Sequence, residues 1–288
     1  MNESGVWPTP VSLKTRLGTV EYAEFGEGAA VVSLHGAMGG YDQSLLLART
    51  IGEDGYRHIG VSRPGYLGTP LSSGKSPEEQ ADLCAGLLDE LGIETAIIMA
   101  VSGGGPCGLT FALRHKDRCR GLVLVSTCGG IMDTPIPAAF HIMKLMARIP
   151  ACASAMRKKV LANIDQAASR SISDPGLRDK TLKDPEAGPL FMELMQSTAD
   201  RMSQRLAGTE NDIRITRSTS YALDEIAVPT LIVHGTADPV APYHHAENLK
   251  SGIPTAELLS IEGGEHAAIF THRKEVRARV TLFLRENS

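Results

Sequence analysis

Short runs of apolar residues alternate along the chain with longer segments of helical periodicity. Four of these runs are almost wholly apolar: 29–34, 95–101, 121–126 and 230–234. A strand that is apolar at consecutive positions is buried on both faces, which is typical of a parallel sheet covered by helices. Weaker patterns at 56–62 and 256–261 predict two further strands of the same sheet.

Two segments near the start of the chain, 11–17 and 19–25, alternate polar and apolar side chains around Gly18. Alternation of this kind predicts an antiparallel hairpin with one face exposed to water. Together with the six apolar runs, the hairpin predicts an α/β fold with a mostly parallel sheet flanked by helices.

The clearest predicted helix begins after Ser76. Ser76 is the N-cap, Pro77 lies in the first turn, Glu79 completes a capping box and Gly92 ends the helix. A second helix, 103–115, directly follows an apolar strand. Helices between consecutive strands are what a parallel sheet requires, because each strand must return to the same edge.

Residues 129–224 contain no clear strand pattern and carry several helical apolar stripes. We interpret them as a helical insertion between two core strands, a cap over the sheet, with residues 1–128 and 225–288 forming the core domain. Seven of the ten methionines fall in this cap, and Met side chains suit the wall of a pocket for apolar ligands. The side chains expected to roof that pocket are Leu145, Met146, Leu190, Met192, Leu194 and Met195.

Length and composition describe an ordinary globular protein. The chain has 288 residues, of which 42% are hydrophobic and 22% are charged, so it can bury a large core. The formal net charge is −4. Without a concentrated basic run, we expect neither nucleic acid nor a membrane surface as a partner. No apolar run reaches about 18 residues, so no membrane span is expected.

The five cysteines are odd in number and show no C-x-x-C spacing. This pattern indicates neither a disulfide framework nor a zinc site, so we expect reduced, mostly buried thiols and no bound metal. The first ten residues lack the basic and apolar regions of a secretory signal. A cytoplasmic location is therefore expected, while the sequence leaves the oligomeric state open.

The segment Ala100-Val101-Ser102-Gly103-Gly104 joins an apolar strand to a helix. Small residues at its first and last positions allow a sharp turn that lifts the central hydroxyl out of the sheet. The segment therefore predicts a nucleophile elbow with Ser102 as the nucleophile.

The same stretch also fits a second motif. Gly103, Gly105 and Gly108 form G-x-G-x-x-G after a strand, which is the fingerprint of a dinucleotide site. Such a site calls for an acid about 20 residues further on, at the tip of the next strand. Residues 126–128 occupy that tip and contain no acid, so the dinucleotide interpretation is disfavoured.

A serine nucleophile needs a histidine base, and the histidine needs an acid to orient it. Among nine histidines, His266 stands out because it follows the last strand, on a loop at the carboxyl end of the sheet. Asp238 lies just past the strand at 230–234, at the same edge. The sequence therefore predicts a triad of Ser102, Asp238 and His266; the alternative for Asp238 is a helix cap beside Pro239.

The glycine-rich turn HGAMGG, residues 35–40, directly follows the strand at 29–34. A turn in this place can aim a backbone N–H at a developing oxyanion. We expect Ala37 to supply one donor and Gly103 the other. Met38 is expected to contact substrate, and His35 is expected to be a structural residue of the turn.

Five motifs in this order resemble those of the α/β-hydrolase fold superfamily: SLHGAMGG, SRPGYLGTP, MAVSGGGP, VPTLIVHGTADPVAP and GGEHAAIF. The resemblance covers most of the chain. It implies a mostly parallel eight-stranded sheet, a helical cap after the sixth strand and no cofactor. Ala100 stands where the elbow commonly has Gly, and it is small enough to preserve the turn.

The reaction expected from these motifs is cofactor-independent hydrolysis of a carboxylic ester or related acyl compound, through an acyl-enzyme, on a small apolar substrate. Relatives that dehalogenate or open epoxides use Asp at the elbow, where this chain has Ser102. Carbon–carbon hydrolases of ring-cleavage pathways also use a serine triad and stay open as an alternative. A third possibility is a small-molecule receptor that keeps the fold without catalysis.

Overall fold

The computed structural model describes residues 8–132, 136 and 138–288. Eight strands form one sheet in the order β1-β2-β4-β3-β5-β6-β7-β8. Strand β2 runs antiparallel to β1 and β4, and all other neighbours pair in parallel. The predicted mostly parallel eight-stranded sheet is confirmed. The strands are β1 (Val11–Thr15), β2 (Gly18–Phe25), β3 (Ala29–Leu34), β4 (Tyr56–Ser62), β5 (Ala96–Val101), β6 (Cys119–Val125), β7 (Thr230–Gly235) and β8 (Ala256–Ile261).

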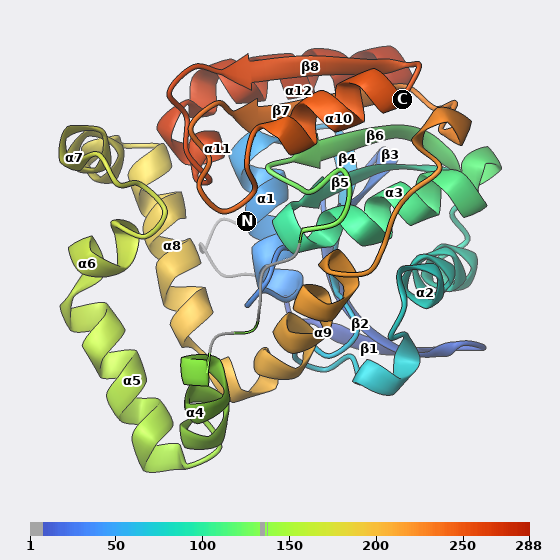
Figure 1. The fold of residues 1–288 in the computed structure, drawn as a ribbon. Coiled ribbons are helices and arrows are strands. Elements are labelled where there is room, and N and C mark those ends of the chain that lie inside the picture. The colour runs from blue at the N-terminus through green and yellow to red at the C-terminus, as the bar shows by residue number, and fades with distance from the viewer. Residues whose placement is uncertain (1–7, 133–135, 137) are drawn as a thin grey trace.

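Both faces of the sheet are covered by helices, as the continuous apolar runs require (Figure 1). In β5, Ile98 and Ala100 pack on one side, while Ile97 and Met99 pack on the other. The first side is covered by α2 (Pro77–Glu90), α3 (Gly105–Arg114) and α10 (His244–Gly252). The second is covered by α1 (Tyr41–Ile51), α11 (Ala268–Thr271) and α12 (Arg273–Asn287).

Helix α2 begins as its sequence predicts. The Ser76 hydroxyl accepts the backbone N–H of Glu79, and the Glu79 carboxylate accepts the backbone N–H of Ser76. These backbone hydrogen bonds hold the pKa of Glu79 below its usual value. The reciprocal pair satisfies two of the N–H groups that a helix start leaves without partners.

The segment between β6 and β7, whose residues 129–224 we call the insertion, is helical wherever a regular element is described. Its helices are α4 (Ala138–Met146), α5 (Pro150–Ala162), α6 (Ile164–Ala168), α7 (Pro175–Lys183), α8 (Ala187–Ala199) and α9 (Leu206–Thr216). Helix α8 packs against α1 and α11, while α5 packs on α8. Figure 1 shows α4 to α8 beside the sheet and α9 returning along the core.

Two further sequence expectations concern cysteines and membranes. Four of the five free cysteines are buried and Cys152 is partly buried, so the expectation of mostly buried thiols is confirmed. Among the helices of the described residues, none is long and apolar enough to span a bilayer.

Candidate active site

Ser102 occupies a sharp turn between β5 and α3, in a short 3-10 segment (Ser102–Gly104). Its φ is 50°, a left-handed conformation that a residue with a side chain rarely adopts. A Cβ on Gly104 would lie 2.6 Å from the carbonyl oxygen of Leu34, so only glycine fits at that position. The strand-turn-helix expected around Ser102 is thus what the structure contains.

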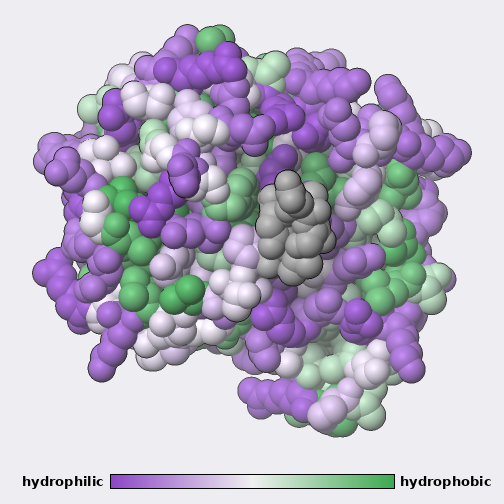
Figure 2. Space-filling model, turned by 180° about the vertical axis from the view of Figure 1, so that it is seen from behind, coloured by the Kyte–Doolittle hydropathy of each residue, from purple (hydrophilic) through white to green (hydrophobic). Residues whose placement is uncertain are grey.

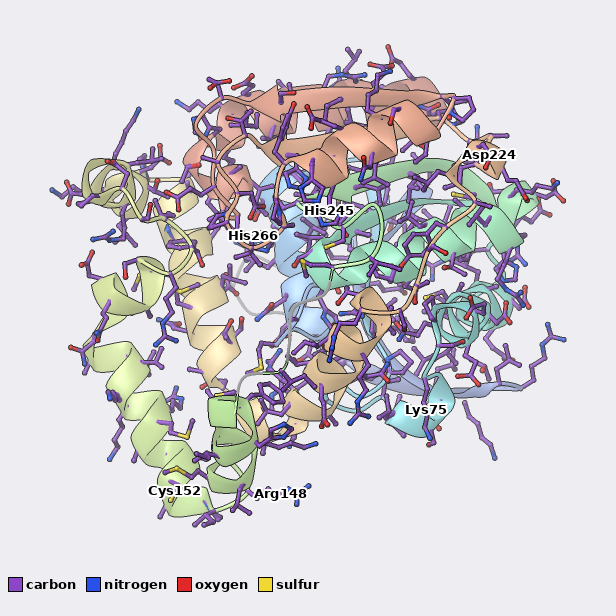
Figure 3. The ribbon with its side chains drawn as sticks, viewed as in Figure 1. Lys75, Arg148, Cys152, Asp224, His245 and His266 are labelled. Carbon is purple, nitrogen blue, oxygen red and sulfur yellow. The ribbon has the colours of Figure 1, made fainter. Side chains whose placement is uncertain are left out.

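Three loops at the carboxyl ends of β5, β7 and β8 bring Ser102, Asp238 and His266 together. The Nε2 atom of His266 lies 3.1 Å from Ser102 Oγ, and its Nδ1 atom lies 2.8 Å from Asp238 Oδ2. Figure 3 labels His266 at this edge of the sheet. The imidazole therefore bridges a hydroxyl and a carboxylate that are far apart in the chain.

The Asp238 side chain is fully buried and held by its own loop. Its Oδ1 atom accepts the backbone N–H groups of Val240 and Ala241 at 2.8 and 2.9 Å. Burial raises the pKa of Asp238, but the hydrogen bond and charge of His266 and the two backbone donors outweigh it, leaving the pKa below its ordinary value. A carboxylate in this state can orient and stabilise an imidazolium.

The turn at residues 35–40 lies directly against the elbow. A Cβ on Gly36 would lie 3.1 Å from the Cβ atom of Ser102, and a Cβ on Gly103 would lie 3.4 Å from the backbone nitrogen of Ala37. Within the described residues, the Ala37 N–H donates to no recorded partner. The Ala37 nitrogen therefore lies next to Gly103, the residue that follows Ser102.

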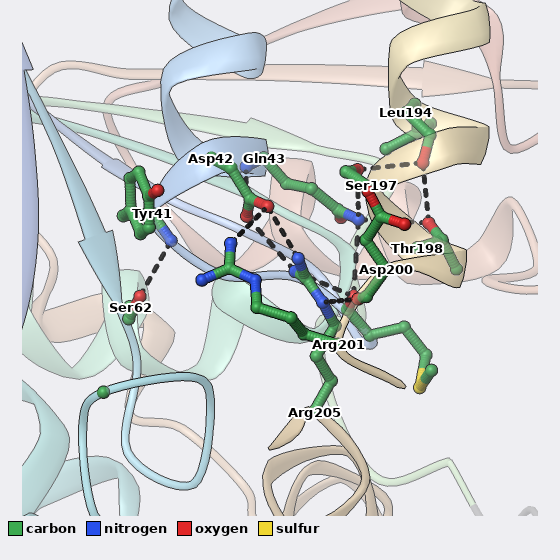
Figure 4. Close-up of polar contacts among 12 residues, drawn as sticks. Tyr41, Asp42, Gln43, Ser62, Leu194, Ser197, Thr198, Asp200, Arg201 and Arg205 are labelled. Atoms are coloured by element: carbon green, nitrogen blue, oxygen red, sulfur yellow. Dashed lines mark hydrogen bonds and ion pairs between the residues drawn. The ribbon is translucent and has the colours of Figure 1, made fainter. Parts of the chain in front are cut away.

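Helix α9 of the insertion holds this turn by its middle residue, Met38, whose φ is 60°. The Met38 N–H donates to Thr209 Oγ1 at 3.0 Å, and its carbonyl accepts from Arg205 and Gln43, each at 3.3 Å. Arg205 is fully buried and pairs with Asp42 at 2.6 Å (Figure 4). The conformation of the turn is therefore fixed by α1 and α9 together.

A second buried cation holds the first half of the same turn. Arg63 donates from Nε to the carbonyl of His35 at 2.9 Å and from Nη2 to that of Gly36 at 3.3 Å. Its guanidinium forms a bidentate pair with Asp212 of α9 at 2.8 and 2.6 Å. Tyr66 donates to the same carboxylate. Burial lowers the pKa of Arg63, but the Asp212 charge more than offsets it and holds the pKa above its ordinary value.

His35 is a structural residue, as the sequence predicts. Its Nε2 atom accepts the backbone N–H of Arg63 at 3.0 Å, so Nδ1 carries the proton and donates to the Gly36 carbonyl at 2.6 Å. Burial and the neighbouring Arg63 hold the pKa of His35 well below its usual value. The ring is thus neutral, with both nitrogens used.

The sequence analysis did not identify the two buried cations, Arg63 and Arg205. Arg63 and Asp212 are 149 residues apart in the chain, and nothing in either local pattern marks it as one half of a buried pair. The only available signal was the position of Arg63, directly after a strand, at the edge of the sheet where site residues gather.

The apolar side chains expected from α8 lie at different depths. Leu190 is buried in the core cluster on the sheet, where it contributes to the attachment of α8. Leu194 and Met195 are half-buried against that cluster, and Met192 is also half-buried. Leu190 is thus a core residue rather than part of a pocket wall.

The side chains expected from α4 need a correction. Leu145 is 65% exposed and Met146 is 42% exposed, so both belong to the outer surface. Phe140 and Met143, on the other face of the helix, pack with Met38 instead. Helical periodicity alone identified the apolar positions of α4 without telling which of them face the site.

Comparison with known proteins gives three kinds of match. A model of the alpha/beta hydrolase family matches residues 31–279. An alpha/beta hydrolase fold protein from Nakamurella multipartita is 32% identical, with a TM-score of 0.78 over 97% of this chain and 100% of that one. The uncharacterized hydrolase YcgS of Bacillus subtilis (strain 168) is 28% identical, over 86% of this chain and 88% of its own. A 2-hydroxy-6-oxo-6-phenylhexa-2,4-dienoate hydrolase of Comamonas testosteroni is 28% identical, over 93% and 91%.

Proposed function

The chain belongs to the alpha/beta hydrolase family and is a hydrolase, and from this premise we propose that it cleaves a carboxylic ester or related acyl compound with Ser102 as nucleophile. The observation that carries the proposal is the position of the His266 ring, hydrogen-bonded to Ser102 on one side and to Asp238 on the other. A base held by an acid and in contact with a hydroxyl is the arrangement that activates a serine.

In the proposed reaction, His266 Nε2 takes the Ser102 proton as Oγ attacks the substrate carbonyl. The imidazolium then returns the proton to the leaving alkoxide, and an ester to Ser102 remains. A water molecule, deprotonated by His266, attacks this acyl-enzyme, and the proton passes to Ser102 as the acid product leaves. Asp238 stays ionised throughout, in keeping with its lowered pKa.

The tetrahedral intermediate carries a negative oxygen that needs fixed donors. We assign these donors to the backbone N–H groups of Ala37 and Gly103, because the Ala37 nitrogen lies next to Gly103, the residue that follows the nucleophile. Loss of one such donor typically costs about 3 kcal/mol of transition-state stabilisation. The buried cations behind the turn would keep the Ala37 donor in place.

We further propose that the insertion, residues 129–224, is a cap over Ser102 and that residues 1–128 and 225–288 form the core domain. Met38 packs with Phe140, Met143 and Leu206, which links the turn beside Ser102 to apolar side chains of α4 and α9. With Met192 and Met195 from α8, these residues are our candidates for the wall that selects an apolar substrate.

The test compares Ser102→Ala with wild type on p-nitrophenyl acetate and butyrate and on a fluorophosphonate probe. We expect turnover to fall by about 10⁴-fold or more and labelling to disappear. Ser126→Ala is a matched control, because Ser126 follows the neighbouring strand β6 and also has a positive φ of 44°. Unchanged turnover and labelling in Ser102→Ala would contradict the proposal. Loss of turnover and labelling in Ser126→Ala but not in Ser102→Ala would also contradict it.

One observation favours a second candidate, hydrolysis of a carbon–carbon bond. The relative from Comamonas testosteroni bears the name of such an enzyme and aligns with nearly the whole chain. A substrate panel that includes simple esters and a 2-hydroxy-6-oxo-dienoate separates the two candidate reactions. Cleavage of the dienoate is measured as the loss of absorbance of its conjugated chromophore. Turnover of the dienoate far above that of every ester would replace the first proposal by the second.

A further inference from the structure

The tip of the insertion, residues 138–163, exposes apolar side chains in a row. Ile142, Leu145, Met146 and Ile149 are all exposed and are spaced i, i+3, i+4 and i+7, which places them along one side of α4 and its end. They are four of the nine large apolar side chains exposed in the described residues. Single exposed apolar residues are normal, but a contiguous row marks an interaction surface.

The inner side of α4 is already occupied. Phe140, Met143 and Ala147 pack there with Met38 and Leu206, near the turn beside Ser102. The outer row therefore belongs neither to the proposed substrate wall nor to the core, and within the described residues nothing covers it.

The tip also has a charge opposite to that of the whole protein. Residues 138–163 contain five Lys or Arg and no Asp or Glu, although the chain has a net charge of −4. Two of the five pair with carboxylates, Lys144 with Glu210 and Arg157 with Asp200. The other three, Arg148, Lys158 and Lys159, are exposed and have no recorded ion pair among the described residues.

Arg148 and the apolar row lie at one projecting corner of the molecule. Figure 1 shows α4 and α5 at a corner of the molecule, and Figure 3 labels Arg148 at that corner, away from His266. In Figure 2 the same corner is the lobe at the lower right, where apolar and hydrophilic side chains lie together. A corner can meet a flat surface without a clash from the rest of the protein.

We propose that this tip docks peripherally on an anionic lipid surface, with Ile142, Leu145 and Ile149 entering the headgroup region and Arg148, Lys158 and Lys159 contacting lipid phosphates. Helices that carry apolar side chains beside Lys and Arg bind at such interfaces through both kinds of contact. The inference goes beyond the proposed hydrolysis and does not depend on it. It departs from the expectation, based on the mild net charge and the lack of a concentrated basic run, that no membrane surface is a partner.

A second copy of the chain fits the tip less well than an anionic lipid surface does. A twofold dimer through the tip would place its uncompensated cations against the same cations of the partner. A soluble anion, in turn, would leave the apolar row exposed. Anionic lipid is the occupant that matches both the charge and the apolar row.

The experiment measures binding of the full-length protein to sedimented vesicles of phosphatidylcholine, alone or with 30% phosphatidylglycerol. We expect binding to the anionic vesicles only, weakened by salt because charges are screened within about 8 Å at physiological ionic strength. Replacing Arg148, Lys158 and Lys159 by Gln should lower partitioning by roughly fivefold per residue. The control replaces Lys14, Arg16 and Lys116 by Gln, which removes three exposed cations outside the tip.

A second variant tests the apolar row. Ile142→Ser, Leu145→Ser and Ile149→Ser together should also lower binding by tenfold or more, and thermal melting checks that the variant is folded. Equal binding to neutral vesicles, no binding to either kind, or an equal loss in the control variant would overturn the proposal. Full binding by the serine variant would overturn it too, as would capture by polyglutamate without vesicle binding, which favours an acidic protein partner.

Discussion

Helix α9 and the tip of the insertion differ in how their side chains are buried and paired. At α9, Arg205 and Asp212 are buried, fully paired and in contact with the core. At the tip, residues 138–163, apolar side chains and unpaired cations face solvent. The same insertion thus contains a rigid attachment beside Ser102 and a surface free for contact. Burial, rather than charge itself, decides which of its cations matter for the geometry of the site.

The difference has an energetic origin. A buried ion pair gives up hydration that its mutual attraction roughly repays, so its net contribution to stability is small, but removal of one partner leaves an uncompensated charge in the interior. A solvent-exposed pair contributes about 0–1 kcal/mol, because water and salt screen it. Substitutions at the two ends of the insertion should therefore differ sharply in cost.

The largest effect is expected from Asp212→Ala. The Arg63 guanidinium would stay buried without its carboxylate, and Tyr66 would lose its acceptor, so the free energy of unfolding should fall by about 3–5 kcal/mol. Arg157→Ala, which breaks the half-exposed pair with Asp200 at the tip, should cost less than about 1 kcal/mol. Urea denaturation at pH 7 measures both. Equal losses would contradict the distinction between the two ends.

Next comes Arg205→Met, which removes a donor to the Met38 carbonyl and leaves Asp42 without its buried partner. We expect kcat for a preferred ester to fall by roughly 10–100-fold with KM little changed, because a shifted oxyanion donor weakens transition-state stabilisation rather than substrate binding. Arg201→Met is the matched control, since Arg201 reaches the same Asp42 carboxylate at 3.4 Å from a more exposed position. A similar fall in both variants would show that Asp42, rather than the turn, is what matters.

A smaller effect should appear in the pH dependence of stability. The pKa of His35 is held well below 6.5 in the folded protein by burial and by Arg63, so the unfolded chain binds its proton first as pH falls. The contribution of His35 to the free energy of unfolding is therefore fully present above pH 6.5. It decreases below pH 6.5, by at most about 1.4 kcal/mol per pH unit.

In His35→Gln the amide oxygen can still accept the Arg63 N–H, but no proton is taken up. The free energy of unfolding, measured by urea titration between pH 6.5 and 5.5, should then depend less steeply on pH than in wild type. His141→Gln, which removes a histidine at the exposed tip, serves as the comparison. An unchanged slope in His35→Gln would show that His35 is not responsible.

The parts of the fold that were predictable follow from local patterns. Apolar runs predicted the parallel strands, and the capping box at Ser76 predicted the start of α2, because each depends on residues close together in sequence. The triad candidates were found because carboxyl ends of parallel strands meet at one edge. The pairing of Arg63 with Asp212 was not predictable, since it joins residues 149 positions apart that look ordinary in their local context.

The tip shows a different limit. The absence of Asp and Glu from residues 138–163 is visible in the sequence, but the net charge of the whole chain does not reveal it. The outward direction of the apolar row was not visible, because α4 has apolar residues on both sides and periodicity alone cannot rank them. Phe140 and Met143 reach Met38, whereas Leu145 does not, and only tertiary packing decides between the two faces.

The smallest effect is expected from Leu145→Ala. Its side chain is largely exposed already, so truncation removes little buried apolar area, and Ala is at least as good a helix former as Leu. The free energy of unfolding should change by no more than about 0.5 kcal/mol in urea denaturation. Phe140→Ala on the opposite side of α4 removes a buried ring from the cluster around Met38 and should cost about 3 kcal/mol or more. If Leu145→Ala proved as costly as Phe140→Ala, the outer row would be part of the core, and the tip could not be a surface free for docking.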